Sequence, residues 1–211
     1  MSSVSSNIGL ILPEIEDQIH QTIMDLYNNF SKLDEIADIY MDEAPASGFW
    51  KISRRVYKKN PSIGDYVGWV NLREGMAAPV WNSLTSYSVG DLIIPPNDNG
   101  HYYECVQSGY SGVNVPSFPT ISGETVRDIY GYSYWTPSKN YNEGDIVLPS
   151  IENNRFYVCT VAGLSGISEP TWTIVDGESV NDNQVVWVGY RIVTWKEKGV
   201  AAHFRPFGKI E

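Results

Sequence analysis

The sequence is poor in the residues on which most metalloproteins and nucleic-acid-binding proteins depend. Its 211 residues include three histidines and two cysteines. It holds no cysteine–histidine cluster with zinc spacing, no EF-hand loop and no phosphate-cradling glycine loop before a helix. The 15 lysines and arginines form no basic stripe, so the usual means of neutralising nucleic-acid phosphates is missing. The sequence therefore predicts no cofactor, no metal and no nucleic-acid partner.

Long hydrophobic runs are also missing. Nothing approaches the roughly 20 apolar residues that cross a bilayer, so we expect no membrane insertion. Residues 1–7 carry no positive charge and Ile8–Leu12 is a short apolar stretch, which predicts no signal peptide and assembly in a cytoplasm. Cys105 and Cys159 fit this compartment, and we expect both to be free and buried.

The acidity of the chain is concentrated at its N-terminal end. The net charge is −10. Residues 1–48 hold nine acids and one base, whereas residues 49–211 are nearly balanced. Acids after Pro13 would suit the first turn of a helix, because the helix dipole favours negative charge there.

Residues 14–41 are predicted to form one amphipathic helix, followed by a linker at 44–48. Apolar residues recur along it at alternating spacings of four and three, the pattern of a heptad a/d stripe. This stripe, the predicted assembly interface, consists of Ile19, Ile23, Leu26, Phe30, Leu33, Ala37 and Tyr40. A narrow stripe suits a partner helix or a groove. It would equally suit folding back onto the chain's own β-rich part, and the sequence leaves both readings open.

The remainder of the chain repeats itself at a period of 54 residues without a gap. The repeated residues are mainly glycine, proline and aromatics, so the repeat encodes turns and packing. The first copy contains Trp81, Tyr87, Gly90, Asp91, Pro95, Tyr103, Cys105, Gly109, Ser111, Gly112, Pro116, Gly123, Glu124, Val126 and Asp128, and each has an identical residue 54 positions later. Duplicated modules more often bind or build than catalyse.

We therefore predict a mainly β fold, with two tandem small β modules in a β-rich body preceded by the amphipathic helix. The predicted segments are 1–48 (helix and linker), 49–80 (β-rich connection), 81–134 (first module), 135–189 (second module) and 190–211 (C-terminal strand and tail). A weaker similarity between residues 66–78 and 190–202 suggests a flanking sheet built from both ends of the chain.

Two duplicated motifs could carry chemistry but are better explained by turns. Gly-x-Ser-Gly at 109–112 and 163–166 lacks the spacing of a nucleophile elbow. The paired carboxylates, Asp91 with Asp145 and Asp128 with Asp182, are expected to cap turn N–H groups. We therefore predict that the protein is not an enzyme.

Aromatic side chains are dense in both modules. Inward-facing rings would fill a small core, whereas exposed rings would stack on sugars, and both remain open. The candidates for sugar stacking are Tyr110, Phe118 and Trp172.

The pattern Trp-x5-Tyr-x2-Gly-Asp followed by a Tyr-x-Cys strand resembles the chitin-binding type 3 module, also called carbohydrate-binding module family 5/12. The longer repeat resembles the tandem version found in structural proteins of tailed bacteriophages. The resemblance covers about residues 64–190. The sugar-binding modules end their second strand in paired tryptophans, whereas this chain has Glu104–Gln107 and Val158–Val161 there. The resemblance therefore implies the fold and does not extend to sugar binding.

From these features we expect a non-enzymatic structural component of a phage particle: a fibre, a tail or head adaptor, or a capsid decoration protein. It would be assembled in the host cytoplasm and reside in the virion. Its partners would be capsid, portal or tail proteins and further copies of itself, with a trimer favoured. The alternative is a carbohydrate-binding protein that adheres to a host or environmental polysaccharide.

Overall fold

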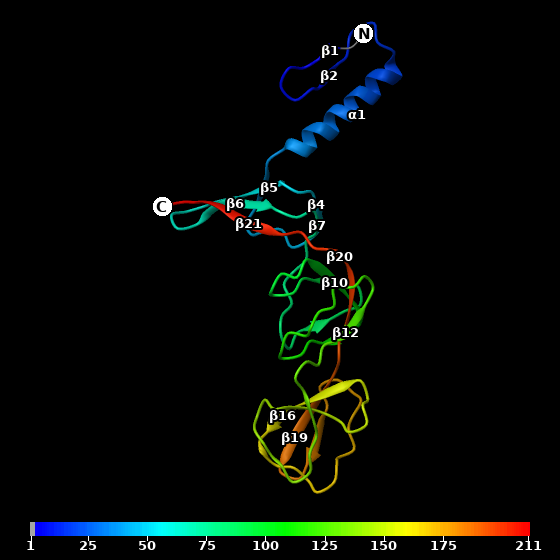
Figure 1. Ribbon diagram of the computed structural model, residues 1–211, viewed down its shortest axis with the longest axis vertical. Helices are drawn as coiled ribbons and strands as arrows, with labels where there is room; N and C mark the ends of the chain where they lie inside the picture. Colours follow the sequence, from blue (N-terminus) through cyan, green and yellow to red (C-terminus); the bar gives the residue numbers. More distant parts are fainter. Residues whose placement is uncertain (1–2) are drawn as a thin grey trace. The chain divides into compact units, whose positions relative to one another are not determined.

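The protein is mainly β, as predicted, with one helix near the N-terminus of the part that is described. The computed structural model describes residues 3–211 (Figure 1). The chain divides into two compact units. The first comprises the described residues up to Ala44 with Arg55–Trp69 and Pro206–Glu211, and the second comprises Pro45–Arg54 and Val70–Arg205.

The first unit contains a hairpin, the helix and most of a four-stranded sheet. These elements are β1 (Ser3–Val4), β2 (Ile11–Leu12), α1 (Ile19–Ile36), β3 (Ile39–Met41), β5 (Arg55–Lys58), β6 (Tyr66–Asn71) and β21 (Phe204–Lys209). The sheet has the order β21-β6-β5-β3, and β3 pairs with β5 in parallel. Strands from both ends of the chain thus share one sheet, although the C-terminal strand is 204–209 and not part of 190–202.

Aromatic rings and one glycine hold this sheet together. Tyr57 packs against Tyr40 and Phe207, with ring centroids 5.7 and 5.9 Å apart. Val56 is fully buried. A Cβ at Gly68 would lie 2.1 Å from the Val56 carbonyl oxygen, so only glycine allows this approach of β6 to β5.

The second unit contains the two repeats. A two-stranded sheet of β4 (Phe49–Trp50) and β7 (Gly75–Met76) precedes them in the chain. The strands of the first repeat are β8 (Ser86–Tyr87), β9 (Leu92–Ile93), β10 (His101–Gln107), β11 (Gly109–Tyr110) and β12 (Thr125–Arg127). Those of the second are β14 (Asn140–Tyr141), β15 (Ile146–Leu148), β16 (Arg155–Val161), β17 (Gly163–Leu164) and β18 (Ser179–Asp182). Each strand of the first repeat begins 54 residues before its counterpart, so the sequence repeat is a structural repeat.

The second repeat closes within its own sequence. Its sheet has the order β13-β15-β16-β19-β18, in which β13 is Ser133–Tyr134 and β19 is Val185–Arg191. Asp182 pairs with Val185 across a two-residue turn, where Asn183 has a φ of 55°. The closing strand β19 therefore follows β18 directly.

The first repeat closes with a strand from the C-terminal part of the chain. Its sheet has the order β12-β20-β10-β9, in which β20 is Thr194–Val200. In Figure 1 this orange-red strand lies beside the green β10. The sequence assigned 194–200 to a separate C-terminal segment, whereas the structure makes it the last strand of the first module. We define the first module as residues 81–128 with 193–200, and the second module, 135–189, is inserted into it.

An apolar cluster joins the two modules. Leu148, Phe156 and Ile192 are its fully enclosed members. Tyr110 of the first module packs on Tyr190, with ring centroids 4.7 Å apart. The two modules are thus connected by two segments of the chain and by a cluster to which both contribute.

We predict that the inserted module can be removed. Replacing residues 129–192 by Asn-Gln would join Asp128 to Val193 through the turn that the second module uses between Asp182 and Val185. The ends are already adjacent, because the Asp128 N–H donates to the Val193 carbonyl at 3.1 Å. We expect the shortened chain to keep a cooperative unfolding transition and the near-ultraviolet signal of buried tryptophans. A chain of residues 129–192 alone is the reciprocal variant, and loss of both folds would mean that the shared cluster is indispensable.

Candidate assembly interface

The helix is shorter than the sequence predicted. It spans Ile19–Ile36, so Ala37 and Tyr40 of the predicted stripe lie beyond it. Residues before it form a local turn, in which the Asp17 carboxylate accepts the Glu14 N–H at 2.7 Å. Ala37 leaves the helical region with a ψ of 139°, and Tyr40 lies in β3. The helix ends because residues 39–41 pair with β5, which outweighs their helical spacing.

The apolar stripe on the helix is exposed. Its five helical members are Ile19, Ile23, Leu26, Phe30 and Leu33. Ile19 is 81% exposed and Phe30 66%, and the other three also count among the exposed large apolar residues. Soluble proteins seldom expose contiguous apolar surface of this kind without using it for binding. Within the first unit, the stripe is therefore not covered by the sheet of β3, β5, β6 and β21.

The buried face of the helix is its polar face. Asp25 and Asn29, one turn apart, are its only buried residues. The Asn29 side chain forms two hydrogen bonds with the backbone of Ile11 in β2, donating to the carbonyl at 2.6 Å and accepting from the N–H at 2.7 Å. The Lys32 ammonium donates to the Gly9 carbonyl. The hairpin is thus held on the helix by polar side chains, and the apolar stripe stays outside.

The sequence analysis missed this hairpin. The signal was present in Ser5 and Gly9, since the Ser5 hydroxyl accepts the Leu10 N–H at 2.9 Å and Gly9 has a φ of 66°. Both are turn residues next to the short apolar stretch Ile8–Leu12. The pairing of the hairpin with the helix was missed because polar residues at helical spacing, such as Asn29, are ordinarily taken as a face exposed to solvent.

The three sugar-stacking candidates lie in three different packing clusters. Phe118 packs on Tyr103 with ring centroids 4.6 Å apart, and Trp172 packs on Tyr157 at 4.2 Å. Tyr110 belongs to the cluster between the modules. The structure therefore does not bring these rings into one platform, and each contributes to a core.

The duplicated serines and cysteines are buried. Ser111 and Ser165 donate to the backbone carbonyls of Asn82 (2.6 Å) and Thr136 (2.9 Å), which fixes the Gly-x-Ser-Gly turns. Both cysteines are free and buried, as predicted. Burial raises the pKa of the Cys105 thiol to about 11, so this thiol stays protonated at neutral pH.

The duplicated carboxylates have two distinct roles. Asp91 and Asp145 cap turns as predicted, accepting the N–H groups three residues before them at 2.7 and 2.8 Å. Asp128 and Asp182 are buried and each binds two tryptophans, which we call the indole clasps. The clasp contacts are Asp128 to Trp81 Nε1 (2.7 Å) and Trp195 Nε1 (2.9 Å), and Asp182 to Trp135 Nε1 (2.8 Å) and Trp187 Nε1 (3.0 Å). Burial raises the pKa of Asp128, although its bonds to the two indoles act in the opposite direction.

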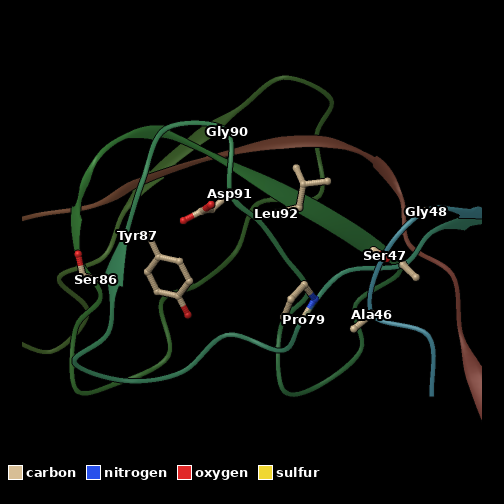
Figure 2. A pocket seen from close by; sticks show the side chains of 10 residues that line it. Ala46, Ser47, Gly48, Pro79, Ser86, Tyr87, Gly90, Asp91 and Leu92 are labelled. Carbon is tan, nitrogen blue, oxygen red and sulfur yellow. The ribbon is translucent and has the colours of Figure 1, made fainter. Parts of the chain in front are cut away.

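A pocket of about 450 Å³ lies in the second unit (Figure 2). It is lined by Ala46, Ser47, Gly48, Ala77, Pro79, Ser86, Tyr87, Gly90, Asp91 and Leu92. The Tyr87 hydroxyl accepts the Asn82 N–H at 3.0 Å, and the Asp91 carboxylate caps its own turn. Both groups are thus engaged by neighbouring backbone, and the wall that remains is mostly apolar.

Neither a metal site nor a membrane span is found in residues 3–211. No three histidine, cysteine, aspartate or glutamate side chains in this range gather as a metal site requires. The one helix described there lacks the length and apolar content to cross a bilayer. Comparisons with protein-family models, with curated proteins and with solved structures found no match to this chain.

Proposed function

We propose that this protein is a non-enzymatic structural component of a tailed-phage particle, assembled through its N-terminal helix. It would serve as a fibre, a tail or head adaptor, or a capsid decoration protein. The helix would bind further copies of the chain or other virion proteins, and the two β modules would form the body that it anchors.

The exposed apolar stripe is the observation that carries this proposal. A helix whose polar side chains hold a hairpin and whose large apolar side chains face solvent is organised for a partner. Fully burying one such side chain contributes roughly 1.5–3 kcal/mol. Five of them in one row can therefore drive association.

The phage assignment rests on the resemblance of the repeats to modules of tailed-phage structural proteins. Duplication supports a building role, because each module reproduces the same buried serine, cysteine and indole clasp. The packed positions of Tyr110, Phe118 and Trp172 offer no observation in favour of the polysaccharide-binding alternative.

The test compares the native mass of the full chain with that of a chain beginning at Asp38. The truncation removes the hairpin and helix but keeps β3, whose pairing with β5 the sheet needs. We expect an oligomer that becomes a monomer when the segment is removed. Two monomers, or two oligomers of equal stoichiometry, would refute self-assembly through the helix.

A further inference from the structure

The pocket beside the first module (Figure 2) combines apolar walls with a single charged side chain. Its volume of about 450 Å³ lies within the range of pockets that hold small molecules. Residues 46–48, Ala77 and Pro79 form one part of its wall, and residues of β8, β9 and the turn between them form the rest. Of the ten residues that line it, all in the described part of the chain, Asp91 is the one that carries a charge. The pocket therefore favours a ligand with an apolar body and a positive charge.

The Asp91 carboxylate is held in place and keeps one oxygen for a ligand. Its Oδ2 accepts the Ser88 N–H at 2.7 Å. The backbone is fixed as well, because the Asp91 N–H donates to the Ser88 carbonyl at 3.0 Å and the Asp91 carbonyl accepts the Cys105 N–H at 2.8 Å. No residue between 3 and 211 donates a hydrogen bond to Asp91 Oδ1 or forms an ion pair with this carboxylate. A cation can therefore bind this oxygen without any rearrangement of the turn.

The Tyr87 ring provides an aromatic surface in the same pocket. Its hydroxyl accepts the Asn82 N–H at 3.0 Å, and its ring meets Trp195 with centroids 4.7 Å apart and planes at 77°. These contacts fix the ring but leave it half-buried. Burial raises the pKa of the Tyr87 hydroxyl, and the charges of Asp128 and Asp91 act in the same direction, so the phenol stays neutral. The face of such a ring attracts ammonium groups.

The second module shows which group this ring position accepts. Tyr141 is the counterpart of Tyr87 and is held in the same way: its hydroxyl accepts a backbone N–H at 2.9 Å, and its ring meets Trp187 with centroids 4.8 Å apart and planes at 77°. The Lys139 ammonium lies 4.7 Å from the centroid of the Tyr141 ring. The equivalent residue of the first module is Thr85, which has no charge. The second module thus supplies a cation to its own ring, and the first module does not.

We propose that this pocket binds an alkylammonium group from outside the chain, with the charge at Asp91 and over the Tyr87 ring. The apolar wall formed by Ala46, Ala77 and Leu92 would hold the aliphatic stem. A lysine side chain of another protein and a free alkylamine share this chemistry. The inference does not depend on the assembly role of the helix, because every residue that lines the pocket lies in the second unit.

Titration of the full chain with n-butylammonium, followed through backbone amide chemical shifts, tests the site. We expect saturable shifts confined to the residues that line the pocket. n-Butanol, which has a similar shape but no charge, should bind at least about tenfold more weakly. Equal binding of the amine and the alcohol, or shifts spread over the whole surface, would overturn the proposal. Nα-acetyl-lysine amide separates the two sources: saturation by this compound as well supports a lysine of a partner protein, and saturation by n-butylammonium alone supports a free amine.

Asp91→Asn tests the contribution of the carboxylate. Asparagine keeps an oxygen for the Ser88 N–H but removes the charge, so n-butylammonium should bind at least about tenfold more weakly. Asp145→Asn is the matched control, because it makes the same change in the second module, and it should leave binding unaltered. Equal affinity in the two variants would exclude Asp91 as the partner of the cation.

Thr85→Lys tests the comparison between the modules. It supplies the first module with the lysine that the second module carries, and we expect it to prevent binding of n-butylammonium. The local backbone already accepts lysine in the second module, since the N–H groups of Thr85 and Lys139 both donate to a serine hydroxyl, at 2.9 and 3.0 Å. Thr85→Gln, which has a long side chain without a charge, is the control and should still bind the amine.

Discussion

Leu26→Glu is expected to dissociate the assembly while leaving each chain folded. Leu26 lies at the centre of the stripe and is 42% exposed in the single chain. A glutamate there meets water in the monomer, so the free energy of unfolding should change by no more than about 0.5 kcal/mol. In the proposed assembly, the same substitution would place a carboxylate in the apolar interface that the stripe forms. We expect the apparent dissociation constant to rise at least about 1,000-fold, equivalent to about 4 kcal/mol.

Sedimentation velocity over a range of protein concentrations measures this change, and near-ultraviolet circular dichroism verifies the fold. Asn28→Glu is the matched control, because it introduces the same charge two residues away at an exposed position outside the stripe. It should leave the mass unchanged. Equal loss of assembly in both variants would attribute the effect to added acidity, and an intact oligomer in Leu26→Glu would place the interface elsewhere.

In the N-terminal segment, the polar face of the helix is covered and its apolar stripe is exposed. Apolar helix faces usually pack on the nearest sheet of their own chain. Here the hairpin makes directional hydrogen bonds to Asn29 and Lys32, which orient the helix by its polar side. The stripe is left outside because the polar contacts, and not apolar packing, decide which face is covered.

The repeat period predicted the duplication and the central strand of each module. Glycines, prolines and aromatics at fixed spacing determine turns and inward-facing positions locally, so the two Tyr-x-Cys strands, β10 and β16, could be placed from the sequence. The C-terminal end of the helix could not be predicted in the same way. The pairing of β3 with β5, which ends it, is a long-range contact that no local sequence pattern contains. The first five members of the predicted stripe lie on the helix, whereas Ala37 and Tyr40 lie beyond it for this reason, and the assembly role of the stripe stays a prediction.

The closing strand of the first module was missed although a signal for it existed. Asp182 is followed within five residues by Val185 and Trp187, whereas nothing equivalent follows Asp128. The missing pair occurs much later as Val193 and Trp195. Pairing confirms the equivalence, because Val126 lies opposite Trp195 just as Val180 lies opposite Trp187. A search for the counterpart of Trp187 in the first repeat would have found Trp195 and so indicated the insertion.

The indole clasps concentrate buried hydrogen bonds on one carboxylate in each module. Asp182 is 3% exposed and accepts three hydrogen bonds: two from Trp135 and Trp187, and one from the Gly166 N–H at 2.7 Å. Removing the carboxylate would leave the N–H groups of the buried Trp187 and of the half-buried Trp135 and Gly166 without this acceptor. A buried unsatisfied donor costs about 1–3 kcal/mol.

Asp182→Ala should therefore destabilise the second module by about 3–5 kcal/mol. Asp145→Ala is the control in the same module, since it removes the same charge but frees only the exposed Asn142 N–H, and it should cost about 1 kcal/mol or less. Urea unfolding followed by tryptophan fluorescence measures both. Because the second module is an insertion, hydrogen exchange should show protection lost in β16, β18 and β19 and retained in β10 and β20. Equal destabilisation by the two variants would mean that the clasp adds nothing beyond a turn cap, and loss of protection throughout both modules would mean that the first module cannot stay folded around an unfolded insert.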